Sequence, residues 1–130
     1  MEERPKVLVV DDEELAQDLL RFFLSKKFDV YTAGSVNAFY NLINRIDFDL
    51  IIMDVSLRDS KDGIELTKEL KASEKYRNVP IFILTAYNTT KERQNAFAAG
   101  AEQFISKPTD TKALLKLIES VLVKPKLAFH

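Results

Sequence analysis

Charged and hydroxyl side chains stand directly after several short apolar runs of this sequence. In chain order they are Asp11 and Asp12 after residues 7–10, Asp54 after residues 50–53, Thr85 after residues 81–84, and Lys107 shortly after residues 103–105. If the runs are parallel strands of one open sheet, their carboxyl ends meet at the edge where such sheets bind ligands. A small volume would then hold three carboxylates, one hydroxyl and one ammonium group.

This combination of groups suits the transfer of a phosphoryl group. Neighbouring carboxylates repel each other and favour a hard divalent cation, and ligands that are all oxygen point to Mg²⁺ (or Mn²⁺). A carboxylate can also attack phosphorus as a nucleophile. The loose transition state of that reaction needs positioning and positive charge, which the metal, Lys107 and the Thr85 hydroxyl could supply.

The apolar runs favour a parallel sheet that is covered by helices on both faces. Residues 7–10, 50–53 and 81–84 are apolar at consecutive positions, which is typical of strands buried on both sides. Two weaker strands are predicted at residues 30–33 and 103–105.

Helical patterns separate the predicted strands. They cover residues 14–26, a segment after a Ser35 N-cap, a segment that begins near 62–63, residues 90–99 before a Gly100 C-cap, and residues 111–123. Five successive strand–helix units predict an α/β domain with right-handed crossovers. We expect one domain over residues 1–130, with its core at about 5–123 and a short tail at 124–130.

Two of the helical segments carry apolar residues at the spacing of a stripe that packs on a core. In the first segment they are Leu15, Leu19, Phe22 and Phe23, and in the second they are Phe39, Leu42, Ile43 and Ile46. We therefore expect both stripes to face the sheet.

The composition is that of an ordinary globular domain. The 130 residues are 46% hydrophobic and 30% charged with a net charge of -1, so no positive excess points to a nucleic acid or a membrane surface. There is no cysteine, and no apolar run approaches the roughly 20 residues that span a bilayer. Because the first residues also lack the apolar stretch of a signal peptide, we expect the protein in the cytoplasm.

Taken together and in order, these landmarks resemble the receiver domain of two-component response regulators. The resemblance rests on the acidic pair after VLVV, Asp54 after LIIM, Thr85-Ala86 after IFIL, and Phe104-Ile105-Ser106-Lys107-Pro108. It covers roughly residues 5–123. The resemblance implies a flavodoxin-like, doubly wound (βα)5 fold whose five-stranded parallel sheet has the order 2-1-3-4-5.

The resemblance also implies a separate role for each acidic residue. Asp54 would be the phosphoacceptor, Asp12 would bind Mg²⁺ directly, and Asp11 would bind it largely through water. The backbone carbonyl of Ser56 would be a further metal ligand.

A second group of residues would contact the phosphate and transmit its presence. By resemblance, Lys107 and Thr85 would contact the phosphoryl group, and the Lys107–Pro108 bond would be cis. Thr85 would move toward the phosphate while Phe104 rotates inward behind it. This population shift would change the surface of the fourth helix, the fifth strand and the fifth helix. Phe104 has no phenolic hydroxyl, so packing alone would hold its position.

The loop after Asp54 departs from the common receiver pattern. Residues 55–63 lack the Met-Pro pair of many receivers, contain one residue more before the closing Asp-Gly pair, and are more highly charged. Ser56 and Tyr87 stand at flanking positions that in the family tune the lifetime of the aspartyl phosphate.

The donor of the phosphoryl group is expected to lie outside this chain. The only histidine is His130, so we expect a sensor histidine kinase or a histidine phosphotransfer protein, or else a small acyl phosphate. The signal would pass to a downstream protein or to an output domain that these 130 residues do not include. The chain would catalyse only its own phosphorylation and dephosphorylation, and we do not expect an enzyme for a free substrate.

Two other hypotheses stay open. A hydrolase of the haloacid dehalogenase type also uses an aspartyl nucleophile and Mg²⁺, but its nucleophile follows the first strand, with a second Asp two residues on. Here Asp54 follows the third predicted strand, and Ser56 stands two residues on. The other hypothesis is a receiver fold that serves only as a docking surface, which the intact set of functional residues disfavours.

Overall fold

The computed structural model describes residues 3–122, in which strands and helices alternate. The strands are β1 (Lys6–Val10), β2 (Asp29–Ala33), β3 (Leu50–Met53), β4 (Ile81–Thr85) and β5 (Gln103–Ser106). The helices are α1 (Glu14–Leu24), α2 (Val36–Ile43), α3 (Gly63–Ala72), α4 (Thr90–Ala99) and α5 (Thr111–Leu122). The predicted tail at 124–130 and the predicted helix end at Val123 lie outside the described residues.

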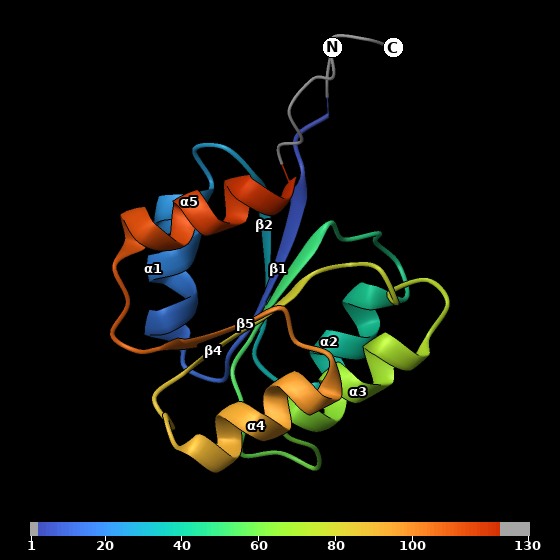
Figure 1. Ribbon diagram of the computed structural model, residues 1–130. Coiled ribbons are helices and arrows are strands. Elements are labelled where there is room, and N and C mark those ends of the chain that lie inside the picture. The colour runs from blue at the N-terminus through green and yellow to red at the C-terminus, as the bar shows by residue number, and fades with distance from the viewer. Residues whose placement is uncertain (1–2, 123–130) are drawn as a thin grey trace, which may run out of the picture.

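The strands form one parallel sheet in the order β2-β1-β3-β4-β5. Helices α1 and α5 cover one face of this sheet, and α2, α3 and α4 cover the other (Figure 1). The predicted doubly wound (βα)5 fold and its strand order are therefore confirmed. No helix within residues 3–122 is both long enough and apolar enough to cross a membrane.

Alternate residues of each central strand point to opposite faces of the sheet and build two separate cores. In β1, Leu8 and Val10 join the core that contains residues of α2, α3 and α4, whereas Val7 and Val9 join the core shared with α1 and α5. All four side chains are buried. Because both faces are covered, the strands are apolar at consecutive positions, as the sequence indicated.

Helix α1 corrects one expectation from the sequence. Leu15, Leu19 and Phe22, predicted to face the sheet, are 81%, 52% and 66% exposed. Leu20 and Leu24 are buried in their place. The apolar arc of this helix is wider than the sheet can cover, so one part of it packs and the other part faces outward.

Capping residues fix where the helices begin and end. The Ser35 hydroxyl accepts a hydrogen bond from a backbone N–H of the first turn of α2 at 3.1 Å, which confirms the predicted N-cap. Gly100 ends α4 with a φ of 109°, a left-handed conformation that favours glycine. The placement of Ile46 on α2 was wrong: the chain leaves the helix at Asn44 to reach β3, and Ile46 packs against the core from beyond the helix.

Candidate functional site

The first feature of the site is a group of carboxylates at the carboxyl ends of β1 and β3. Asp11 and Asp54 are buried at 3% and 7% exposure, and the Asp12 side chain is 13% exposed. One carboxylate oxygen from each residue lies within 4.8 Å of the others. Neighbouring strands hold the backbone here, since the Asp11 N–H donates to Ala33 O at 3.0 Å and the Asp54 N–H donates to Val10 O at 2.9 Å. The sheet therefore brings together residues that lie far apart in the sequence.

The start of α3 fixes the backbone of Asp54 from the other side. A Cβ atom on Gly63 would lie 2.0 Å from the carbonyl oxygen of Asp54, so only glycine allows this approach. The Gly63 N–H donates to Val55 O at 2.9 Å, and Asp62 begins the helix in a reciprocal capping box with Glu65. The Asp-Gly pair of the sequence is thus needed for the position of Asp54 as well as for the helix.

Lys107 reaches back over the carboxylates from the end of β5. Its Nζ atom lies 2.6 Å from Asp11 Oδ2 and 3.1 Å from Asp54 Oδ2. Its backbone N–H donates to Thr85 O at 2.9 Å, which ties the end of β5 to the end of β4. The Lys107–Pro108 bond is cis, as the resemblance implied.

The ionisation of the site reflects a balance between burial and pairing. Burial raises the pKa of Asp54 above its ordinary value, and the neighbouring charge of Asp11 adds to that effect, although Lys107 opposes it. For Lys107, burial alone would lower the pKa, but hydrogen bonds and charges from Asp11 and Asp54 outweigh it and raise the pKa. Lys107 is therefore held as a cation, and its charge does not fully offset the cost of burying the Asp54 carboxylate.

A second cation contacts the site, and reasoning from the sequence missed its role. Arg58 Nε lies 2.7 Å from Asp12 Oδ2, although the two residues are 46 positions apart. The only signal in the sequence is a cationic residue in the charged loop that follows Asp54.

The residues present fit a hard divalent cation. The donor atoms of the three carboxylates are all oxygen, and Asp12 and Asp54 line a hollow of about 220 Å³ at the molecular surface. This hollow, called the acidic hollow below, is lined by Asp12, Glu13, Asp54, Ser56, Arg58, Ala86, Tyr87 and Lys107. Ser56, the residue expected to offer its carbonyl, lies beside Asp54, and its N–H donates to Asp54 Oδ1 at 3.2 Å.

The residues predicted to transmit a signal lie behind this hollow. Thr85 is fully buried, and its hydroxyl accepts a hydrogen bond from the Tyr87 N–H at 3.2 Å. Phe104, on the adjacent strand, is buried at 7% exposure in the core shared with α2, α3 and α4. The Arg93 guanidinium of α4 lies 5.8 Å from the centre of the Phe104 ring. The structure thus connects the end of β4, the aromatic ring of β5 and helix α4.

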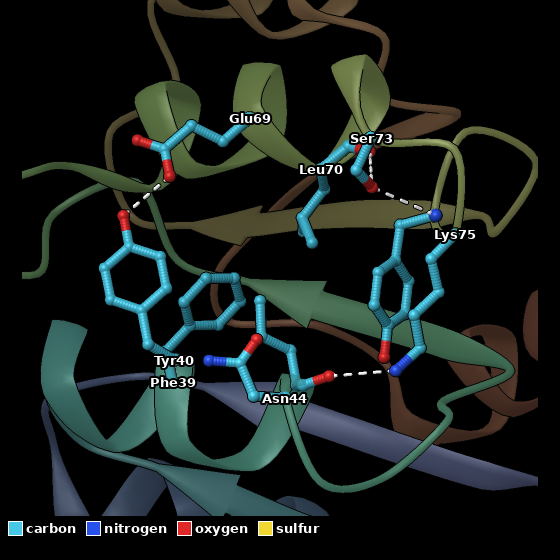
Figure 2. Close-up of a pocket in the computed structure, with 9 residues that line it drawn as sticks. Phe39, Tyr40, Asn44, Glu69, Leu70, Ser73 and Lys75 are labelled. Carbon is cyan, nitrogen blue, oxygen red and sulfur yellow. Dashed lines mark hydrogen bonds between the residues drawn. The ribbon is translucent and has the colours of Figure 1, made fainter.

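A separate hollow of about 380 Å³ lies between α2 and α3 (Figure 2). At one end the Tyr40 hydroxyl donates to Glu69 Oε1 at 2.6 Å, and at the other Lys75 Nζ donates to the carbonyl of Ile43 at 3.1 Å. Phe39 and Leu70 point into the space between them (Figure 2). None of its lining residues belongs to the acidic hollow.

Comparison with known proteins identifies the family. The sequence model of the response regulator receiver domain matches residues 7–119. The chain belongs to the response regulator receiver family. The matched region of this receiver contains every residue of the predicted site, from Asp11 to Lys107.

The receiver is similar in sequence to Protein PetR of Rhodobacter capsulatus. The two are 36% identical over 119 residues, which are 91% of this chain and 48% of PetR. The chain therefore spans about half the length of that curated relative.

Solved structures share the receiver's fold. The chemotaxis protein CheY4 of Vibrio cholerae superposes with a TM-score of 0.82 at 30% identity, over 92% of this chain and 99% of that one. NtrX of Brucella abortus superposes with a TM-score of 0.84 at 27% identity, over 92% of this chain and 27% of that one. A receiver of this fold thus occurs both as nearly a whole chain and as part of a longer one.

Proposed function

We propose that this receiver accepts a phosphoryl group on Asp54 from a phosphohistidine of another protein. One observation carries the proposal: Asp54 is buried beside a second buried carboxylate, Asp11, and Lys107 Nζ contacts both. Buried carboxylates that share one ammonium at the mouth of a hollow are suited to a reaction that brings further charge into the site.

The proposal includes a divalent cation, Mg²⁺ or Mn²⁺. Its ligands would be carboxylate oxygens of Asp12 and Asp54 and the backbone carbonyl of Ser56, and Asp11 would hold it largely through water. The clustering of the three carboxylates is consistent with this arrangement. When bound, the cation supplies positive charge to the oxygens of the transferred group. The close approach of three carboxylates with all-oxygen donors supports this part of the proposal.

The chemistry is a transfer between two nucleophiles. A carboxylate oxygen of Asp54 forms a bond to phosphorus while the bond from phosphorus to the donor's imidazole nitrogen breaks, and the electron pair of that bond returns to the imidazole. Lys107 Nζ, at 3.1 Å from Asp54 Oδ2, places a positive charge beside the reacting oxygens. The backbone of Asp54, held by β1 and by Gly63, keeps the nucleophile in position.

The output would pass through Thr85 and Phe104. Thr85 would turn its hydroxyl from the Tyr87 N–H toward the phosphoryl group, and the space it leaves would alter the packing around Phe104. The face made by α4, β5 and α5 would then change toward its partner. The contact of Arg93 with Phe104 supports a path from β5 to α4.

The donor protein would cover the exposed apolar part of α1. Leu15, Leu19 and Phe22 point outward, and Leu19 also lines a groove beside Lys107 and Pro108. This groove shares Lys107 with the acidic hollow, so a protein seated on it would present its histidine next to Asp54. Exposed apolar patches of this kind mark interaction surfaces.

The chain would act as a switch in the cytoplasm and would have no activity on a free substrate. A sensor histidine kinase or a histidine phosphotransfer protein would be the donor. A downstream protein or an output domain in the same protein would read the altered face.

The test is mass spectrometry of the intact protein after incubation with acetyl phosphate and Mg²⁺. We expect the wild type to gain one phosphate, and the Asp54→Ala variant to gain none. Asp49→Ala, which removes an exposed carboxylate near the start of β3, is the matched control and should behave as the wild type. A wild type that binds Mg²⁺ but stays unmodified would favour the hypothesis of a docking surface instead.

A further inference from the structure

Arg58 closes the outer side of the acidic hollow. Its Nε atom lies 2.7 Å from Asp12 Oδ2, while Lys107 contacts Asp11 and Asp54 on the inner side. The Arg58 side chain is 72% exposed, whereas the Asp12 side chain is only 13% exposed. Each of the three clustered carboxylates is thus already paired with a cation of this chain.

The loop from β3 to α3 holds Arg58 in this place. Leu57, the preceding residue, is buried at 2% exposure. The following residue, Asp59, accepts a hydrogen bond at 3.0 Å from the N–H of Val36, the first residue of α2. Between these two anchors Arg58 adopts a φ of 52°, in the left-handed region that residues other than glycine rarely occupy. Arg58 therefore lies between two anchored neighbours, and its guanidinium contacts Asp12.

We infer that Arg58 is an internal counter-cation of Asp12, which a divalent cation must displace and which thereby weakens metal binding. The inference rests on the proposed function, because it assumes that the carboxylates hold a metal. The hydrogen bond to Arg58 occupies an oxygen of Asp12 that would otherwise be free for the metal. The guanidinium also repels any cation that approaches the same carboxylate.

Arg58 should weaken the binding of the metal only modestly. The Asp12 side chain is largely shielded, but the Arg58 side chain is in contact with water, and exposed ion pairs are weak. Arg58 should therefore tune the affinity for the metal and leave the binding of the metal possible. When the metal is bound, the guanidinium is released to the solvent at the mouth of the hollow.

The first test is a calorimetric titration of Mg²⁺ into the wild type, Arg58→Gln and Lys61→Gln. The two variants lose the same charge from the same loop, but Lys61 pairs with Glu69 and Tyr40, away from the acidic hollow. We expect Arg58→Gln to bind Mg²⁺ about two- to fivefold more tightly than the wild type. We expect the dissociation constant of Lys61→Gln to equal that of the wild type.

A second measurement follows the guanidinium itself. In a ¹⁵N-resolved NMR spectrum of the wild type, the Arg58 Nε–Hε signal should shift as Mg²⁺ is added, toward the position of a solvated arginine. Saturation of this shift should coincide with saturation of the calorimetric titration.

Several results would overturn the inference. Equal affinities for Mg²⁺ in the wild type and Arg58→Gln, or an equal gain in both variants, would show that Arg58 does not compete at Asp12. Weaker binding in Arg58→Gln would show that the guanidinium supports the metal site. If neither the wild type nor Arg58→Gln binds Mg²⁺, the metal of the proposed function fails, whereas equal binding by both leaves that function intact.

Discussion

The acidic hollow at the carboxyl ends of the strands and the hollow between α2 and α3 shift the pKa of their carboxylates in opposite directions. At Asp54 burial outweighs the pairing with Lys107, and the pKa is raised. At Glu69 burial also acts to raise the pKa, but hydrogen bonds from Lys61 and Tyr40 outweigh it, and the pKa is lowered. Both hollows contain lysine and carboxylate groups, yet only the first leaves buried negative charge incompletely balanced.

This difference separates a reactive site from a structural one. Around Glu69 the polar groups satisfy one another near the surface, so no further ligand is needed. Around Asp54 an additional cation and an incoming phosphoryl group would complete the balance of charge. The hollow between α2 and α3 is nevertheless the larger of these two, so volume does not distinguish the reactive site from the structural one.

The largest effect is expected from removing the shared ammonium of the acidic hollow. Lys107→Met keeps an unbranched side chain that is one atom shorter, but leaves Asp11 and Asp54 without a cation, so phosphorylation by acetyl phosphate should slow about a hundredfold. Intact-mass spectra taken over time would measure the rate. Lys75→Met, at the rim of the other hollow, is the matched control and should leave the rate unchanged. Equal slowing in both variants would break the distinction between the hollows.

An intermediate effect on the rate of phosphorylation is expected from a change in the apolar groove beside the acidic hollow. Leu19→Asp places a charge in the groove beside Lys107, so transfer from a histidine phosphotransfer protein that phosphorylates the wild type should slow about tenfold. The rate with acetyl phosphate should stay the same, because that donor does not cover α1. Phe97→Asp makes a similar change at an exposed side chain of α4, and it should affect neither rate. Equal slowing with both donors would place the defect in the site and not in docking.

A smaller effect on phosphorylation, but a clear one on the switch, is expected at Thr85. Thr85→Ala removes the hydroxyl that would reach the phosphate, so Asp54 should still be phosphorylated at a rate within about tenfold of the wild type. The NMR chemical-shift changes around Phe104 that follow phosphorylation of the wild type should be lost. Thr32→Ala, on edge strand β2, should retain them. Unchanged shifts in Thr85→Ala would remove Thr85 from the switch.

The smallest effect is expected from the hollow between α2 and α3. Tyr40→Phe removes the hydroxyl that contacts Glu69 and Lys61, and the free energy of unfolding in urea should fall by at most about 1 kcal/mol. Phosphorylation of Asp54 should proceed at the wild-type rate. A variant that folds normally but is phosphorylated more slowly would show that this hollow is coupled to the acidic one.

Much of the fold and of the acidic site followed from the sequence alone. Consecutive apolar residues require cover on both faces of a sheet, and the carboxyl ends of parallel strands meet at one edge. From those two facts the sequence predicts that Asp11, Asp54 and Lys107 lie close together, and the structure has Lys107 in contact with both carboxylates. Local hydrogen bonding also determined the caps at Ser35 and Gly100, which depend only on nearby residues.

Other features were decided by the tertiary structure. The sequence predicted that Leu19 faces the sheet, but the way α1 packs decided that Leu20 is buried and Leu19 is exposed. The pairing of Arg58 with Asp12 depends on a loop that Leu57 and Asp59 anchor to other elements. The physical reason is the distance along the chain over which each interaction acts. Polarity patterns and helix caps depend on neighbouring residues, so the sequence predicts them. The rotation of a helix about its axis, and an ion pair between residues 46 positions apart, depend on how distant elements pack.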